Sequence, residues 1–180
     1  LITDGVVIPV EISYLQLAPG GESTAHVGIT QCRWVGGGYR NLTSISDITG
    51  VGVALPAGHV FTTPVVYKTG EPVFVQLIDP DANLDALVAE QVDVELTTES
   101  GDREELRLLE TDPDSGRFLG YIQSVRGMPV PGNCMLEAGI NDVLTTRYVD
   151  DGSAVAVAVI SLDPFSRVFD SATGALIDGA

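Results

Sequence analysis

The sequence is poor in basic residues. It contains 25 acidic residues against 9 basic ones, Lys68 is its single lysine, and the formal net charge is −16. A surface of this charge repels nucleic acid and anionic membrane, so both are excluded as partners. The same charge suits calcium binding, or it forms a solvated face that serves solubility alone.

Long apolar runs are also missing. No stretch of about 18 apolar residues is present, so the sequence predicts no segment that spans a bilayer. The chain begins at Leu1 and shows no basic stretch followed by an apolar one. We therefore expect a processed protein or a piece of a longer one.

Cysteine and histidine are scarce. The two cysteines, Cys32 and Cys134, are far apart in the sequence, and His26 and His59 are the only histidines. A structural zinc site needs four converging ligands, which these isolated residues do not indicate. We expect a Cys32–Cys134 disulfide, with two buried free thiols as the alternative. Closing a loop of roughly 100 residues stabilises a fold by about 4–5 kcal/mol in the chain-entropy model, and a disulfide would place the protein outside the cytoplasm.

Residues for catalysis are few. A hydrolytic triad needs a histidine beside a nucleophile, and neither histidine lies in such a context. Glu104 and Glu105 are adjacent in a predicted strand and point to opposite faces, which separates them for acid–base catalysis. The glycine-rich segments lack the strand–GxGxxG–helix pattern of phosphate-binding loops. We therefore predict no catalytic residues and no enzyme activity.

Short alternating runs dominate the chain instead. Plentiful glycine (20 residues) and proline (10 residues) favour many short strands. In Gln91–Thr97, for example, Val92, Val94 and Leu96 share one face and polar residues the other, which is typical of half-buried antiparallel strands. The same alternation continues through Glu71–Tyr121, in the runs Pro72–Ile78, Glu104–Glu110 and Phe118–Gln123.

These runs predict an all-β fold built on an immunoglobulin-like antiparallel β-sandwich. Residues 62–150 hold about seven strands, the size of such a sandwich. Residues 1–61 form an additional N-terminal β subdomain, which a Cys32–Cys134 bridge would join to the sandwich through a shared core or interface. Residues 151–180 form a C-terminal tail, which is either the start of a further β module or a donated strand.

The tail contains an apolar strand. Ser153–Leu162 has almost no polar face, and a flat apolar strand promotes aggregation unless it is paired. Its default partner is its own sandwich. The alternative is donation to a neighbouring copy, because a head-to-tail contact that does not close builds a filament. The candidate assembly residues are Val155, Val157, Val159 and Phe165.

The best candidate metal site is the acidic segment Asp79–Asp85. Asp79, Asp81, Asn83 and Asp85 offer oxygen ligands at alternate positions, which suits a hard cation such as calcium. The segment lacks the glycine and the distal glutamate of an EF-hand loop. The alternative is that Asp79 and Asn83 cap turns through the backbone.

Two further sets of side chains can bind ligands. Asp112 and Asp114 form a second acidic cluster, which can lie at the same end of the sandwich as the first. Trp34, Tyr39 and Phe61 can form an aromatic patch for a glycan, although such residues more often belong to a core.

Several stretches resemble a known module. GEPVFVQLIDPDANLD, VDVELTTESGDREELRLLETDPDSGRFLGYI, CMLEA and LTTRYVD are similar to the repeat-type immunoglobulin-like β-sandwich module of large bacterial surface and secreted proteins. DPFSRVFDSATGALIDGA resembles the opening of a carboxypeptidase-regulatory-like module and stops after its first strand and turn. The resemblance implies an extracellular structural or adhesive role and supplies no catalytic residues.

We therefore expect a non-enzymatic subunit or module of an extracellular bacterial surface fibre. It would assemble head to tail by β-strand addition, with copies of itself or with neighbouring modules of the same polypeptide. The alternative is a monomeric adhesin module that binds glycan or protein through loops around Asp79–Asp85 or Trp34–Tyr39, with calcium in one version.

Overall fold

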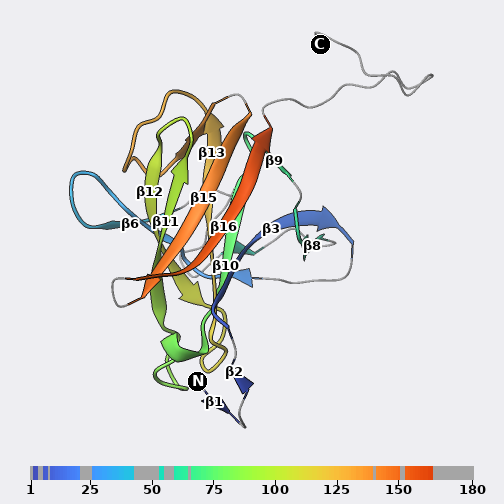
Figure 1. Cartoon of the computed structure of the whole chain (residues 1–180), viewed down its shortest axis with the longest axis vertical. Coiled ribbons are helices and arrows are strands. Elements are labelled where there is room, and N and C mark those ends of the chain that lie inside the picture. Colours follow the sequence, from blue (N-terminus) through green and yellow to red (C-terminus); the bar gives the residue numbers. More distant parts are fainter. Residues whose placement is uncertain are drawn as a thin grey trace.

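The computed structural model (Figure 1) describes residues 2–3, 6–7, 9–20, 26–42, 53–54, 59–64, 66–139, 141–150 and 153–163. Within these residues the regular structure is β-strand apart from one 3-10 turn, so the prediction of an all-β fold is confirmed. In this part of the chain no helix is long and apolar enough to cross a membrane. The elements, in chain order, are β1 (Ile2–Thr3), β2 (Val6–Val7), β3 (Glu11–Pro19), β4 (His26–Val27), β5 (Gln31–Arg33), β6 (Tyr39–Asn41), β7 (Val53–Ala54), β8 (His59–Thr62), β9 (Val66–Lys68), β10 (Pro72–Ile78), η1 (Pro80–Ala82), β11 (Gln91–Thr98), β12 (Arg103–Glu110), β13 (Arg117–Arg126), β14 (Leu136–Ala138), β15 (Asp142–Asp150) and β16 (Ser153–Asp163).

Most of the strands belong to one 12-stranded sheet. Its main order is β8-β3-β10-β13-β12-β11-β15-β16-β9, and β5, β6 and β14 branch from this path. The pairs are antiparallel except for β13–β14 and β16–β9, which are parallel. The described sheet is therefore mostly antiparallel, as predicted, and is mixed because of these two short parallel pairs. β9 and β16 are far apart in the chain, whereas β13 and β14 are consecutive and are joined by residues 127–135. Both connections are longer than a tight hairpin, because parallel pairing requires a crossover connection.

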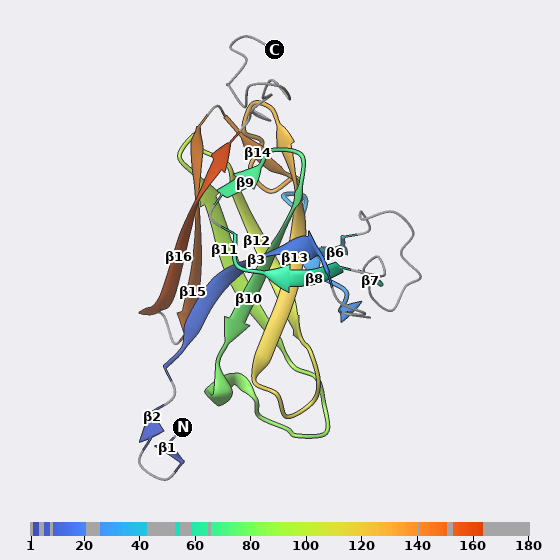
Figure 2. The same cartoon turned by 90° about the vertical axis from the view of Figure 1, so that its right-hand side faces the viewer.

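The sheet curls until its two ends meet. Figure 2 shows β15 and β16 on one side of the molecule and β10 and β13 on the other. Tyr14 of β3 closes the gap, because its hydroxyl lies 2.8 Å from that of Thr146 in β15 and donates to the Ala158 carbonyl of β16 at 3.2 Å. The result is a sandwich-like arrangement around one core. A specifically immunoglobulin-like arrangement stays a prediction.

Strand β12 is the point where the sheet branches. Leu109 and Glu110 pair with β13, whereas Leu106 and Arg107 pair with β5. β5 thus takes the place of β13 along the middle of β12. Gly120 in β13 permits the close packing beside this branch, since a Cβ there would lie 2.5 Å from a methyl group of Leu108.

The core follows the alternation of the sequence. In β11 and β12 every second residue is buried, and in β10 Val73, Val75 and Leu77 are all 0% exposed. The aligned apolar faces of both sides of the curled sheet fill the space between them. The largest fully buried side chains are Tyr67, Tyr121, Phe74, Phe118, Leu77, Leu96, Leu106, Leu108, Ile122, Leu136, Leu144 and Leu162.

A second, smaller cluster lies on the other face of β10. Phe74 is 1% exposed and packs with Val27, Leu119 and Tyr121, and Phe61 of β8 covers it edge to face at 5.1 Å. β10 is therefore covered on both faces, because β8 folds over its outer side.

Strands from all three predicted segments share the sheet. β3 and β5 from the N-terminal segment pair with β10 and β12, and β16 from the tail pairs with β15 and β9 of its own chain. Pro9 lies outside the strands, since β2 ends at Val7 and β3 begins at Glu11, and proline has no N–H to donate to a neighbouring strand.

Replacing Val75 with alanine should lower the free energy of unfolding by about 2–3 kcal/mol, because the buried valine loses two methyl groups and leaves a cavity. The matched control is Val159→Ala, where the valine is 62% exposed and the loss should stay below about 1 kcal/mol. Urea unfolding of both variants measures the difference. Equal losses would contradict the assignment of inner and outer faces.

Candidate functional site

The predicted disulfide is present. Cys32 of β5 is bonded to Cys134 across a sequence separation of 102 residues, with a Cα–Cα distance of 5.6 Å. Cys32 is 0% exposed, and the chain has no free cysteine. The bond therefore joins the strand that branches from β12 to the loop that leads into β14.

A buried carboxylate supports this loop. Glu104 of β12 is 1% exposed, and its two oxygens accept from the backbone amides of Asn133 and Cys134, each at 3.0 Å. Burial raises the pKa of Glu104 to about 7, although the amide hydrogen bonds oppose this shift. Glu104 is therefore a titratable group directly beneath the disulfide.

Two further carboxyl groups, those of Asp102 and Glu137, lie beside Glu104. Asp102 accepts from the backbone amide of Glu137 at 2.9 Å, and both side chains are buried. One oxygen of each, Oδ1 of Asp102 and Oε2 of Glu137, has no hydrogen-bond partner among the described residues. Burial and then the nearby carboxyl of Glu137 raise the pKa of Asp102, which favours a protonated form at this position.

Asp142 joins the neighbouring turns. Its carboxylate accepts from the amides of Ser100, Gly139 and Val143 and from the Ser100 hydroxyl. Burial alone would raise the pKa of Asp142, but these hydrogen bonds outweigh it and lower the pKa. The Asp142 carboxylate thus links the turn that contains Ser100 to the backbone of residues 139–143.

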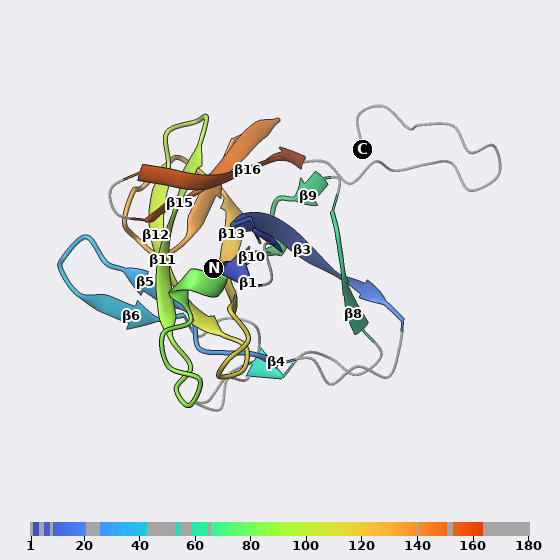
Figure 3. The same ribbon diagram turned by 60° about the horizontal axis from the view of Figure 1, so that its bottom comes forward.

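The β5–β6 hairpin projects from the side of the sheet, as Figure 3 shows. Its turn needs glycine, because Gly37 and Gly38 have φ values of 96° and 81°. The hairpin also contacts β11 and β12 through charged groups. Arg33 pairs with Glu105 at 3.0 Å, and the Tyr39 ring lies under the guanidinium of Arg107.

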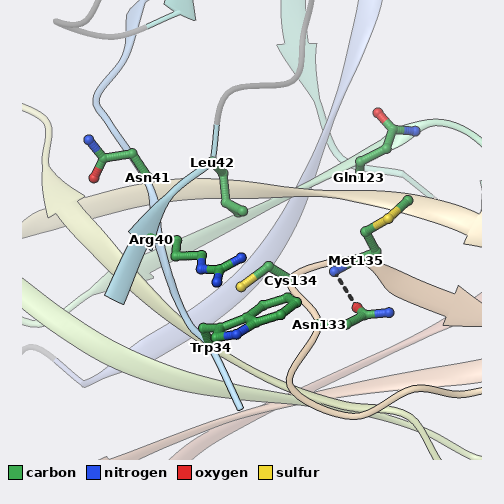
Figure 4. Close-up of a pocket in the computed structure, with 8 residues that line it drawn as sticks. All are labelled: Trp34, Arg40, Asn41, Leu42, Gln123, Asn133, Cys134 and Met135. Carbon is green, nitrogen blue, oxygen red and sulfur yellow. Dashed lines mark hydrogen bonds between the residues drawn. The ribbon is translucent and has the colours of Figure 1, made fainter. Parts of the chain in front are cut away.

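A cavity of 280 Å³ lies between this hairpin and the disulfide loop. Trp34, Arg40 and Leu42 line it from the hairpin side, and Cys134 and Met135 line it from the loop. In Figure 4 the guanidinium of Arg40 lies over the Trp34 ring and points toward Cys134. The distance from its Cζ to the ring centroid is 3.6 Å.

The predicted aromatic patch does not form as one surface. Trp34 lines the cavity, Tyr39 packs against Arg107, and Phe61 packs against Phe74 in the smaller core cluster. Only Trp34 remains a candidate for ligand contact.

In the predicted calcium segment the described side chains mostly bind backbone or one another. Asp79 is 2% exposed and accepts from the amide of Asp81, capping η1, and Asp85 accepts from the amide of Leu87. The Asn83 amide donates to Asp114, so the two acidic clusters do lie at the same end.

The carboxylates of this segment do not converge. In the described part of the chain, the one group of three or more His, Cys, Asp or Glu ligand atoms within 4.8 Å of one another is Cys32, Glu104 and Cys134, and both of its sulfur atoms are in the disulfide. The turn-capping alternative therefore accounts for Asp79, and calcium binding stays a prediction.

The candidate assembly strand is β16. Val157 and Val159 point outward and are 53% and 62% exposed. Val155 lies in the strand, but its side chain is outside the described part, and Phe165 is wholly outside it. β9 covers one edge of β16 only from Ser161 to Asp163.

The sequence predicted no catalytic residues, and the structure does not test this prediction. His26 and His59 lie in β4 and β8, with side chains outside the described part. The position of Glu104 beneath the disulfide loop and that of Arg40 in the cavity were not predicted from the sequence. Glu104 carried a signal, because it shares the inward face of its strand with Leu106 and Leu108, and an inward acid demands hydrogen-bond partners. Arg40 carried none.

A comparison of the sequence with protein-family models gives no match, and a comparison with curated proteins gives no significant match. The resemblance to a repeat-type surface module therefore stays a prediction.

Removing the disulfide should destabilise the fold strongly. For the double variant Cys32→Ala/Cys134→Ala we expect the free energy of unfolding to fall by about 3–5 kcal/mol, because the unfolded chain regains the freedom of a long loop. The measurement is denaturant unfolding of the oxidised wild type against the variant. Reduced wild type should match the variant, and a loss below about 1 kcal/mol would contradict the account.

Glu104 should make stability depend on pH in a defined direction. Its pKa is raised to about 7 in the folded state, so its contribution to stability is present at low pH and is lost as pH rises through about 7. Glu104→Gln removes this titration and should also lose about 1–3 kcal/mol, because one backbone amide loses its acceptor.

The difference in unfolding free energy between wild type and Glu104→Gln should therefore shrink from pH 5 to pH 8. Glu105→Gln, on the outer face of the same strand, is the control and should show no such trend. A difference that stays constant from pH 5 to pH 8 would contradict this, because it would mean that Glu104 is charged throughout the range.

Proposed function

We propose that the chain is a non-enzymatic structural module of an extracellular bacterial surface fibre. Copies or neighbouring modules would join by β-strand addition at the open edge of β16. The observation that supports this most strongly is the incomplete coverage of that edge: β15 pairs along the whole of β16, whereas β9 pairs with Ser161–Asp163 alone.

The open part of the edge has the properties of a docking strand. Between Ser153 and Ile160 no described strand other than β15 forms a backbone ladder with β16. β3 lies beside it, and the Tyr14 hydroxyl donates to the Ala158 carbonyl. Unpaired N–H and C=O groups on a flat strand are a template for another strand. Val157 and Val159 would add apolar contacts to the main-chain hydrogen bonds, which is the usual division between affinity and specificity in strand addition.

The occupant we assign to this edge is another copy of the same chain. The strand lacks a charged group that blunts an edge, since Ser153–Leu162 contains no Lys, Arg, Asp or Glu. The net charge of −16 opposes self-association, and salt weakens this repulsion because the Debye length is about 8 Å at physiological ionic strength. Assembly should therefore increase with salt.

An extracellular location is supported by the disulfide. A buried disulfide that joins residues 102 apart is typical of proteins that fold in an oxidising compartment.

The alternative of a monomeric adhesin module is also supported by one feature. The cavity beside Trp34 and the disulfide is a concave surface with mixed polar and apolar lining, as ligand sites have. It lies apart from the β16 edge, so ligand binding in this cavity does not itself require the chain to be monomeric.

The test is the assembly state of the whole chain, measured by sedimentation velocity and negative-stain microscopy over a range of protein and salt concentrations. We expect wild type to form oligomers or fibres and Val159→Lys to remain monomeric, because a lysine on the open strand is both charged and flexible. The matched control is Val130→Lys, which places the same change on another exposed valine and should assemble as wild type does.

A wild type that stays monomeric at every concentration and salt level would overturn the proposal, and so would equal assembly of both lysine variants. Repeating the wild-type measurement in calcium and in chelator tests the segment Asp79–Asp85 separately. Loss of fibres in chelator alone would assign a metal to the assembly.

A further inference from the structure

The cavity at the β5–β6 hairpin differs in charge from the rest of the molecule. The chain carries 25 acidic residues, yet no acidic side chain of the described part lines this cavity. Its one charged group is the guanidinium of Arg40. The cavity is therefore a cationic spot on a strongly anionic protein.

Arg40 differs from the arginines around it. Arg33 pairs with Glu105, Arg103 with Glu95, and Arg107 with Asp93. Arg40 has no such carboxylate partner among the described residues, and its recorded contact is the stacking over Trp34 at 3.6 Å. Stacking uses the face of the planar guanidinium, so it leaves the N–H donors at its rim free to bond, and no ion pair with a described residue occupies them.

Gln123 supplies a further polar group. Its Nε2 donates to the carbonyls of Gly70 and Ser124, and its Oε1 acceptor is not used by described residues. A hydroxyl group, which can donate to this oxygen, matches it. The Asn41 side chain is directed away from Arg40 in Figure 4, and its Oδ1 accepts from Gln31.

The remaining lining is apolar. Leu42 and Met135 present aliphatic surface, and the disulfide at Cys134 adds sulfur. Figure 4 shows the Leu42 side chain directed toward the space between Arg40 and Met135. A volume of 280 Å³ suits one small unit of a ligand rather than a drug-sized molecule.

From these contacts we infer that the cavity binds a carboxylate-bearing sugar unit, such as a hexuronate residue of an acidic glycan. The carboxylate accepts from the rim of the Arg40 guanidinium, since paired N–H donors fit a carboxylate in a bidentate manner. A ring hydroxyl donates to the Gln123 Oε1, and a C–H face packs on Leu42 and Met135. The inference rests on the adhesin alternative and is independent of the β16 edge.

Ligand binding can be followed through Trp34, because it is the single tryptophan of the chain. The probes are sodium D-glucuronate, D-glucose and sodium acetate, titrated into the whole protein at constant ionic strength. Isothermal calorimetry repeats each titration without relying on the fluorophore. We expect saturable binding of glucuronate, and at least tenfold weaker binding of glucose and of acetate.

The variant Arg40→Met should weaken glucuronate binding by roughly tenfold or more, because a charge-assisted hydrogen bond is lost. Its matched control is Arg117→Met, which removes an exposed arginine at the start of β13 and should bind as wild type does. Val159→Lys should also bind normally, which separates this site from assembly.

Four outcomes would overturn the inference. Absence of saturable glucuronate binding removes the site. Acetate binding as tight as that of glucuronate reduces it to a simple anion site, and equal binding of glucose removes the role of the charge. Unchanged binding in Arg40→Met would place the ligand elsewhere.

Discussion

Strand β5 enters the sheet beside β12, and its Cys32 is bonded to Cys134 in the loop before β14. This bond holds the inserted strand and the loop against the same part of β12. Glu104 then orders the loop by accepting from two of its backbone amides. The cavity of Figure 4 exists where these segments meet. The branching of the sheet, the loop and the candidate ligand site therefore all depend on one covalent link.

Buried acidic side chains are the second constraint on this fold. Each is buried without an arginine or lysine partner in the described part of the chain, and five of the six accept from backbone amides instead. A carboxylate with several N–H donors stays charged at lower cost than an isolated one. Part of the acidic composition thus orders turns, and does not belong to a solvated face. The six are Asp79, Asp102, Glu104, Glu110, Glu137 and Asp142.

The sequence predicted the local elements well and the long-range ones poorly. The inward residues of β11 and the bounds of β16 followed from period-two alternation, which is a local property. The disulfide could be predicted because only one pairing is available. The insertion of β5 and the parallel pairing of β9 depend on contacts between distant segments, which no local pattern encodes. The same holds for the cavity, since Trp34 and Met135 meet only after the chain has folded.

Strand addition at β16 is the central claim about function, and backbone hydrogen exchange tests it most directly. Amide exchange in dilute and in concentrated protein should differ within β16. The account predicts that amides between Ala156 and Ile160 gain protection on assembly, while those of Ser161–Asp163, already paired with β9, do not change. Unchanged exchange throughout β16, with protection gained at another surface, would contradict it.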